Sequence, residues 1–255
     1  FFKQTLYEEI IAPRRIRLHR QVGKALEEVY AKRLEEHAAE LAEHFSHSSD
    51  PADLAKAVSY SEMAAGRAWA VYAYGEVVRL LEQALKVQEV LDPDDKAKRC
   101  DLFLGLGSAV SASGQPRRAL DVELPEAFSL AEDIGDSERA SRICQQTMGV
   151  LYRYWSALPS GPGLVEMVQW AERADRYAQP DTTGRALADI ALGNVKYVTG
   201  YPNEGVPLIR RGLGLARRLG DADTFWWAAA YWLGRVGAPQ HTEETLRLAE
   251  ELAQG

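Results

Sequence analysis

Two pairs of small residues recur at one fixed spacing, and this spacing limits the folds open to the chain. Gly107 and Gly193 lie 86 residues apart (193 − 107), as do Ala119 and Gly205 (205 − 119). A constant offset between matched positions indicates an internal repeat. Small residues let two helices cross closely, so we expect stacked helical hairpins. Such arrays bind and position other molecules and seldom carry out chemistry.

The stretch 103–120 indicates which repeat this is. It runs through a first helix, a tight turn and the start of a second helix, with bulky, apolar or small residues at Phe103, Leu106, Gly107, Val110 and Ala119. This order resembles a tetratricopeptide (TPR) repeat, and a similar array follows at Leu192, Gly193, Gly200, Tyr201, Pro202 and Gly205. The resemblance implies an all-α, TPR-like α-solenoid, that is, a right-handed superhelix of helical hairpins. Half of the offset exceeds the ~34 residues of the standard repeat, so we expect longer helices and loops.

The whole chain reads as helix, since strand-like alternation is absent and Gly and Pro fall at boundaries. We expect a helical connector over residues 1–50, with helices at 2–11, 13–30 and 34–45. A repeat array of about four to five hairpins is expected over residues 51–255, truncated at its C-terminal end. The expected pairs are Ala52–Val71 with Tyr74–Val90, Asp94–Ser113 with Pro116–Ile134, Ser137–Ser156 with Gly163–Ala178, Thr182–Thr199 with Pro202–Leu219, and Asp223–Val236 with Thr242–Gln254.

Close helix contacts are predicted at the small and apolar motif positions. They are Ala65, Val77, Ala84, Gly107, Ala119, Gly193 and Gly205. The interval from Ala119 to Ala127 is eight residues, where the motif expects seven, and Pro125 lies inside it. Proline removes a helical hydrogen bond and clashes with the preceding turn, so we predict a kink or bulge there.

The first fifty residues resemble a different arrangement. The segments concerned are Thr5–Ile10, Arg14–His19, Ala25–Glu27 and Arg33–Phe45. They are similar to the junction between the ATPase module and the repeats in bacterial signal-transduction ATPases, a class that includes ATPase-linked adenylate/guanylate cyclases and LuxR-type or maltose-activator-like transcription regulators. The resemblance implies a non-catalytic, cytoplasmic regulatory arm that contacts an upstream ATPase module of the same chain. The phosphate-binding pattern G-x-x-x-x-G-K-[ST] is absent, so this stretch is not expected to hydrolyse nucleotide.

One helix face carries residues that suit a metal. His37, Glu40 and His44 are spaced i, i+3, i+7, and His47 follows. Imidazoles and a carboxylate on one face could bind a divalent metal, which leaves a metal-dependent hydrolase as an alternative. The order is not H-E-x-x-H, and a partly exposed polar face is the favoured interpretation. We therefore predict no catalytic residue, no cofactor and no metal site.

Charge and cysteine content exclude several classes of partner. The net charge of −7 argues against direct nucleic-acid binding, and no apolar run is long enough to cross a bilayer. Two cysteines form no disulfide framework or zinc pattern, which suits a reducing cytoplasm. The basic cluster Arg14, Arg15, Arg17 and Arg20 is expected to pair within the chain or to dock on the upstream module.

The motif register predicts a groove that receives a protein or peptide segment. Its principal lining residues are predicted to be Glu62, Trp69, Ser108, Arg153, Asn194 and Tyr197. Only Arg153 and Asn194 suit the capture of a terminal carboxylate, so a mixed polar and aromatic groove for a helical or extended segment is favoured. Trp226 and Trp227 are adjacent, so part of that aromatic surface is expected to be exposed unless another repeat covers it.

These observations predict a protein-interaction and regulatory repeat domain that serves as the sensing or coupling arm of a signalling ATPase. A stand-alone TPR scaffold is the main alternative. The identity of the ligand, the output domain and the oligomeric state are left open.

Overall fold

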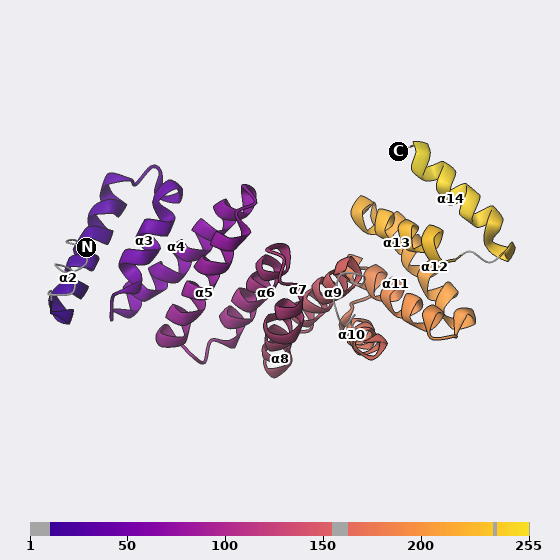
Figure 1. Ribbon diagram of the computed structural model, residues 1–255, viewed down its shortest axis with the longest axis horizontal. Helices are drawn as coiled ribbons and strands as arrows, with labels where there is room; N and C mark the ends of the chain where they lie inside the picture. The colour runs from indigo at the N-terminus through magenta and orange to yellow at the C-terminus, as the bar shows by residue number, and fades with distance from the viewer. Residues whose placement is uncertain (1–10, 155–162, 237–238, 255) are drawn as a thin grey trace. The chain divides into compact units, whose positions relative to one another are not determined.

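The structure is a computed structural model that describes residues 11–154, 163–236 and 239–254, and within these ranges every regular element is helical (Figure 1). The expected all-α fold is therefore confirmed. No described helix is long and apolar enough to pass through a bilayer. The expected helix at residues 2–11 lies outside the described residues, apart from Ile11.

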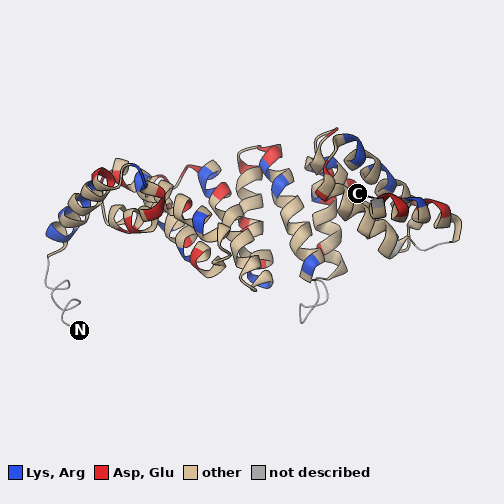
Figure 2. Cartoon of the chain, turned by 90° about the horizontal axis from the view of Figure 1, so that it is seen from above, with Lys and Arg blue, Asp and Glu red and all other residues tan. Residues whose placement is uncertain are grey.

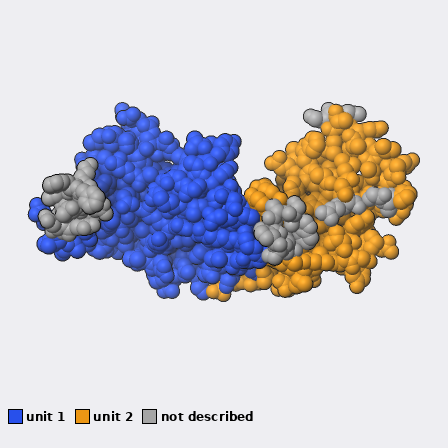
Figure 3. Space-filling model, in the orientation of Figure 1, with its two compact units in different colours: residues 1–130 blue, residues 131–255 orange. Residues whose placement is uncertain are grey.

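The chain forms two compact units, residues 1–130 and residues 131–255 (Figure 3). The first contains α2 (Ala12–Val29), α3 (Ala38–Ser46), α4 (Pro51–Ala70), α5 (Tyr74–Leu91), α6 (Lys96–Ala112), α7 (Pro116–Arg118) and most of α8 (Leu124–Asp133). The second contains α9 (Ser137–Tyr154), α10 (Leu164–Tyr177), α11 (Thr183–Val198), α12 (Pro202–Leu219), α13 (Ala222–Arg235) and α14 (Thr242–Gln254). Short 3₁₀ turns cover Leu34–His37 and Pro239–His241. The helix ends lie within a few residues of those predicted.

Local capping explains these boundaries. Asp136 and Asp221 accept hydrogen bonds from the backbone N–H groups of Arg139 and Thr224, at 2.9 and 3.0 Å. Each follows a glycine with positive φ, +67° at Gly135 and +68° at Gly220. Glycine ends one helix without steric cost, and aspartate then opens the next.

The connector packs directly on the first repeat helix. Gly23 of α2 lies against the buried ring of Phe45, and a Cβ at Gly23 would be 3.1 Å from that ring. Basic residues recur along the first described helix, α2 (blue in Figure 2). One residue of this helix, Arg20, pairs with Asp50 at 2.6 Å and with Asp53 at 2.8 Å. Glu27 of α2 accepts hydrogen bonds from Lys56 and Tyr60 of α4, each at 2.7 Å. The basic cluster thus contributes at least one intramolecular link between α2 and the start of α4.

The predicted irregularity near Pro125 is present as a π-helical segment, Ala119–Glu123, between α7 and α8. A π-bulge adds one residue to a helical turn, so it absorbs the extra residue of the eight-residue interval. As a result Ala119 and Ala127 are both fully buried. The bulge also buries Glu123, whose carboxylate accepts a hydrogen bond from Arg118 at 2.8 Å.

In the second unit, α11 and α12 cross very closely. A Cβ at Gly193 would lie 2.7 Å from the carbonyl oxygen of Gly205 and 2.9 Å from the backbone nitrogen of Ile209. No side chain fits between these backbones, so both positions need glycine. The core beside this crossing is built around the fully buried Trp232, with Ile209 among its neighbours.

Candidate functional site

Three successive first helices of the second unit, α9, α11 and α13, line an open pocket of about 240 Å³, and α10 contributes one residue to it. Its apolar and aromatic lining comes from Met148, Gly149, Tyr152, Ala174, Leu187, Ala188, Ala191 and Trp227, and its polar lining from Gln145, Arg153, Asp223 and Thr224. A concave, largely apolar site with a few polar groups is the usual form of a ligand-binding site.

An aromatic corner closes one side of this pocket. The ring of Tyr152 meets Trp227 and Tyr231 edge-on, with centroid distances of 5.2 and 4.9 Å. Asn194 donates a hydrogen bond to the hydroxyl oxygen of Tyr152 at 3.3 Å. These contacts hold the rings in place before any ligand arrives. Trp227 nevertheless remains 36% exposed to solvent. The corner is thus a preorganised contact surface.

The six residues predicted to line a groove lie in different surroundings. Arg153 lines the pocket, whereas Asn194 is buried and Tyr197 packs against the core around Trp232. In the first unit, Glu62 pairs with Lys98 at 2.6 Å.

The other two predicted groove residues also lie in the first unit. Ser108 donates to the carbonyl oxygen of Leu104 at 3.1 Å, and Trp69 is 41% exposed beside Tyr74. The groove assignment of all six residues, Arg153 included, stays a prediction.

Sequence reasoning missed the contributions of Leu187, Asp223 and Trp227 to the pocket. The sequence did contain a sign of the α9 side of the pocket, because Gln145, Gly149 and Tyr152 fall at helical spacing on one face. The last hairpin matches the motif poorly, so the sequence did not indicate which of its two adjacent tryptophans faces the groove.

The helix face considered above as an alternative metal site is divided among separate partners. His37 stacks on Tyr30 with ring centroids 3.5 Å apart, and its Nδ1 is 3.6 Å from Glu40. His44 approaches His19 instead, with an Nδ1–Nδ1 distance of 3.0 Å. Across the described residues, no group of three or more His, Cys, Asp or Glu side chains is arranged to hold a metal ion. The metal-dependent alternative therefore finds no site in this part of the chain.

A histidine cluster does form where α2 meets α3, and it predicts acid sensitivity. Burial, with the charges of His47 and His44, lowers the pKa of His19 from 6.5 to about 4; Glu43 opposes this shift and Arg15 adds to it. Between these two values an unfolded His19 binds a proton that the folded one does not, so acidification destabilises the folded state in this window.

We expect the wild-type chain to lose stability more steeply than His19→Gln as the pH falls from 6.5 to 4. Urea unfolding at several pH values measures this difference in slope. Equal slopes for the two proteins would contradict the assignment to His19.

Comparison with known proteins shows what this fold is like. No protein-family model matches the chain, and no curated protein matches it. Among solved structures, a putative kinesin light chain from Podosopora anserina with nearly identical TPR-like repeats is 16% identical, with a TM-score of 0.56 over 77% of this chain and 93% of that one. The Rap conjugation gene regulator of the plasmid pLS20, in complex with the Phr* peptide, is 13% identical, with a TM-score of 0.51 over 86% of this chain.

The match covers 60% of the Rap regulator's own length. Both similarities concern the fold alone, and they confirm that this chain has a TPR-like α-solenoid fold.

Proposed function

We propose that the chain is a non-catalytic interaction domain that binds a protein or peptide segment in the groove lined by α9, α11 and α13. The observation that carries this proposal is the preorganised apolar pocket at the exposed face of three successive first helices. The Rap regulator, which has a similar fold, was solved with a peptide bound, and this supports a peptide as the kind of ligand. Fold alone does not settle function, so the pocket residues carry the proposal.

The pocket's chemistry favours binding over catalysis. Its titratable lining groups are Tyr152, Arg153 and Asp223, and among the described lining residues there is no His, Cys or Glu. The side chains that most often serve as general base or as activated thiol nucleophile are thus missing from the described lining.

A substitution that fills the pocket tests this function. The Cβ position of Gly149 has no heavy atom within 4 Å, and Gly149 lines the pocket. Gly149→Leu therefore adds a side chain to the pocket from a Cβ position that is free of clashes, and it raises helix propensity. Peptides selected from a random 12-residue library on the wild-type chain should lose at least about tenfold in affinity for the variant, as measured by fluorescence polarisation.

Gly66→Leu is the matched control, because Gly66 lies in α4 and its Cβ position is equally free. It should bind the selected peptides like the wild type. If Gly149→Leu binds them unchanged, or if the library yields no binder, the groove is not a peptide site.

The finer proposal is that this repeat domain is the sensing or coupling arm of a longer bacterial signalling ATPase. Its support is the resemblance of the first fifty residues to the ATPase–repeat junction, together with the packing of α3 on α4 and the side-chain contacts between α2 and α4. A ligand can shift such a system only through a difference in affinity between its states. In this account, a bound segment changes how the array packs on the upstream module and so biases its nucleotide-controlled states.

The full-length open reading frame tests this finer proposal. A phosphate-binding loop encoded within a few hundred residues upstream of Phe1 would agree with it, and the domain beyond would identify the output. A reading frame with no ATPase module would contradict it and leave a stand-alone scaffold.

A further inference from the structure

We propose that the pocket receives one bulky apolar side chain of the bound peptide, and that an acidic side chain nearby in the same peptide pairs with Arg153. This inference rests on the proposed peptide-binding function and adds the chemistry of the ligand. It concerns an internal peptide segment rather than a chain terminus.

The size and lining of the pocket argue for a single apolar side chain. Its volume of about 240 Å³ lies below the ~300–1,000 Å³ of typical small-molecule sites. It exceeds the ~150 Å³ of an apolar protein cavity that holds benzene, so one aromatic ring or a leucine side chain can enter. Met148, Leu187 and Ala191 offer aliphatic surface from two helices. Methionine in particular adapts to irregular apolar shapes.

Trp227 provides the contact expected to dominate binding. Tryptophan is enriched among residues that carry most of the energy of an interface. The edge-on contact with Tyr152 fixes the indole, so little side-chain entropy is lost on binding. The adjacent Trp226 is 50% exposed but does not line the pocket. The two tryptophans therefore form a natural pair of test and control.

The rim of the pocket provides the charge for an acidic partner. Arg142, Gln145, Gly149 and Arg153 fall on one face of α9 at i, i+3, i+7 and i+11. Both arginines are exposed, and neither forms an ion pair or hydrogen bond with another described residue.

Elsewhere in this unit, Arg185, Arg210, Arg211 and Arg217 each bind a carboxylate. Asp223 is the one carboxylate among the described lining residues, and it lies in the first turn of α13, where the helix dipole already interacts with it. The two arginines thus give the α9 side of the groove a positive charge that suits a carboxylate on the peptide.

The same geometry favours an acidic side chain over a C-terminal carboxylate. Capture of a terminal carboxylate would use several convergent donors, and Asn194 would be the second donor beside Arg153. The amide nitrogen of Asn194 instead donates to Tyr152, and the residue is 2% exposed. Arg153 alone is then available, which suits one Asp or Glu side chain.

The experiment uses 12-residue library peptides with acetylated N-termini and amidated C-termini, so that side chains carry the only carboxylates. Binders selected on the whole chain are measured by fluorescence polarisation. Changing the bulky apolar residue of a binder to Ala should weaken binding at least about 30-fold, and Trp227→Ala should do the same. Trp226→Ala should change affinity less than about threefold.

The acidic contact is tested by a double-mutant cycle. Changing the peptide's Glu to Gln, or Arg153→Gln in the protein, should each weaken binding about five- to tenfold, and the two changes together should weaken it no further. Arg153→Lys should restore part of the affinity and its salt dependence. Arg218→Gln, at an exposed position of α12 outside the pocket lining, is the matched control and should have no effect.

The outcomes separate this inference from the proposed function. Binders that are blocked by Gly149→Leu but show no apolar anchor, or no coupling to Arg153, overturn the inference and leave the peptide-binding function standing. If binders appear only when the same library is made with free C-terminal carboxylates, the inference is also overturned. A library that yields no binder at all would contradict both this inference and the proposed peptide-binding function.

Discussion

Gly205→Ala is expected to destabilise the folded chain by about 3 kcal/mol, because the added methyl group has no space where α11 and α12 cross. A Cβ at Gly205 would contact the carbonyl oxygen of Gly193 and lie 2.8 Å from the backbone nitrogen of Tyr197. These neighbours are backbone atoms, so no side-chain rotation can relieve the clash. The two helices must separate, and the packing of Ile209 between them is lost with their separation. Urea unfolding followed by far-UV circular dichroism measures the change.

Gly214→Ala in the same helix is the control. The nearest heavy atom to its Cβ position is the end of the flexible Arg218 side chain, at 3.9 Å. Replacing a helical glycine with alanine in open space should stabilise the chain by about 0.5–1 kcal/mol. If the two variants lost equal stability, the helix crossing would not be as close as described.

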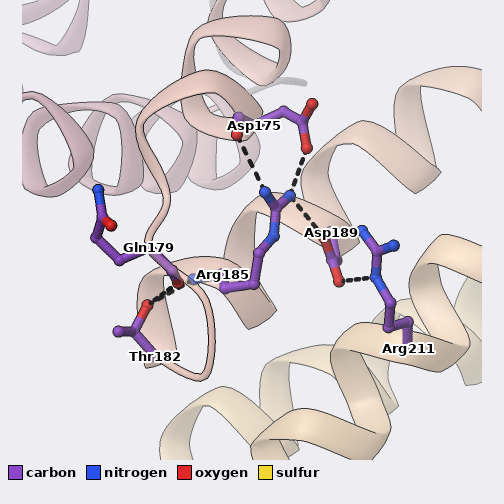
Figure 4. A network of polar contacts seen from close by, with 6 residues as sticks. All are labelled: Asp175, Gln179, Thr182, Arg185, Asp189 and Arg211. Carbon is purple, nitrogen blue, oxygen red and sulfur yellow. Dashed lines mark hydrogen bonds and ion pairs between the residues drawn. The ribbon is translucent and has the colours of Figure 1, made fainter. Parts of the chain in front are cut away.

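Asp189→Ala is expected to cost about 3 kcal/mol, because it removes the buried carboxylate that pairs with both Arg185 and Arg211 and leaves the mostly buried Arg185 with Asp175 alone. Asp189 is fully buried, and Figure 4 shows it between Arg185 and Arg211. One carboxylate oxygen lies 2.6 Å from Arg185, and the other lies 2.5 Å from Arg211. Arg185 also reaches Asp175 on α10 at 2.5 Å, so the network joins α10, α11 and α12. Only Arg211, with a half-exposed side chain, can return to water when Asp189 is removed.

Glu251→Ala removes an ion pair of similar geometry from an exposed position. Arg217 donates to the two carboxylate oxygens of Glu251 at 2.9 and 2.6 Å, and both side chains are more than 40% exposed. Exposed pairs contribute about 0–1 kcal/mol, so urea unfolding should show little change. A loss for Glu251→Ala as large as that for Asp189→Ala would show that burial does not set the value of these contacts.

The helices could be predicted because their signals are local. Aspartate after glycine at residues 135–136 and 220–221 fixes a helix end and the next start within two residues. The π-helical segment could also be anticipated from the sequence. The Ala119–Ala127 interval has one residue more than the motif, and Pro125 weakens the helical hydrogen bonding nearby. No long-range information was needed for these features.

The pocket could be predicted only in part, because its lining depends on how helices pack. The register of α9 alone was enough to propose Arg153, which lies in the pocket lining. The side chain of Asn194 points into the protein, where it supports Tyr152, and the motif register contains no information on that contact. Likewise, Trp227 lines the pocket because Trp232 is fully buried and fixes the rotation of α13. A count along the helix could not distinguish Trp227 from Trp226.

Nuclear magnetic resonance of the tryptophan indole N–H groups tests the central claim most directly. The chain has six tryptophans, so six indole signals can be assigned by substitution. On titration with a selected library peptide, the signal of Trp227 should shift strongly, and the signal of the exposed Trp69 in α4 should stay in place. Peptide binding that moves Trp69 and leaves Trp227 unchanged would contradict a binding groove on α9, α11 and α13.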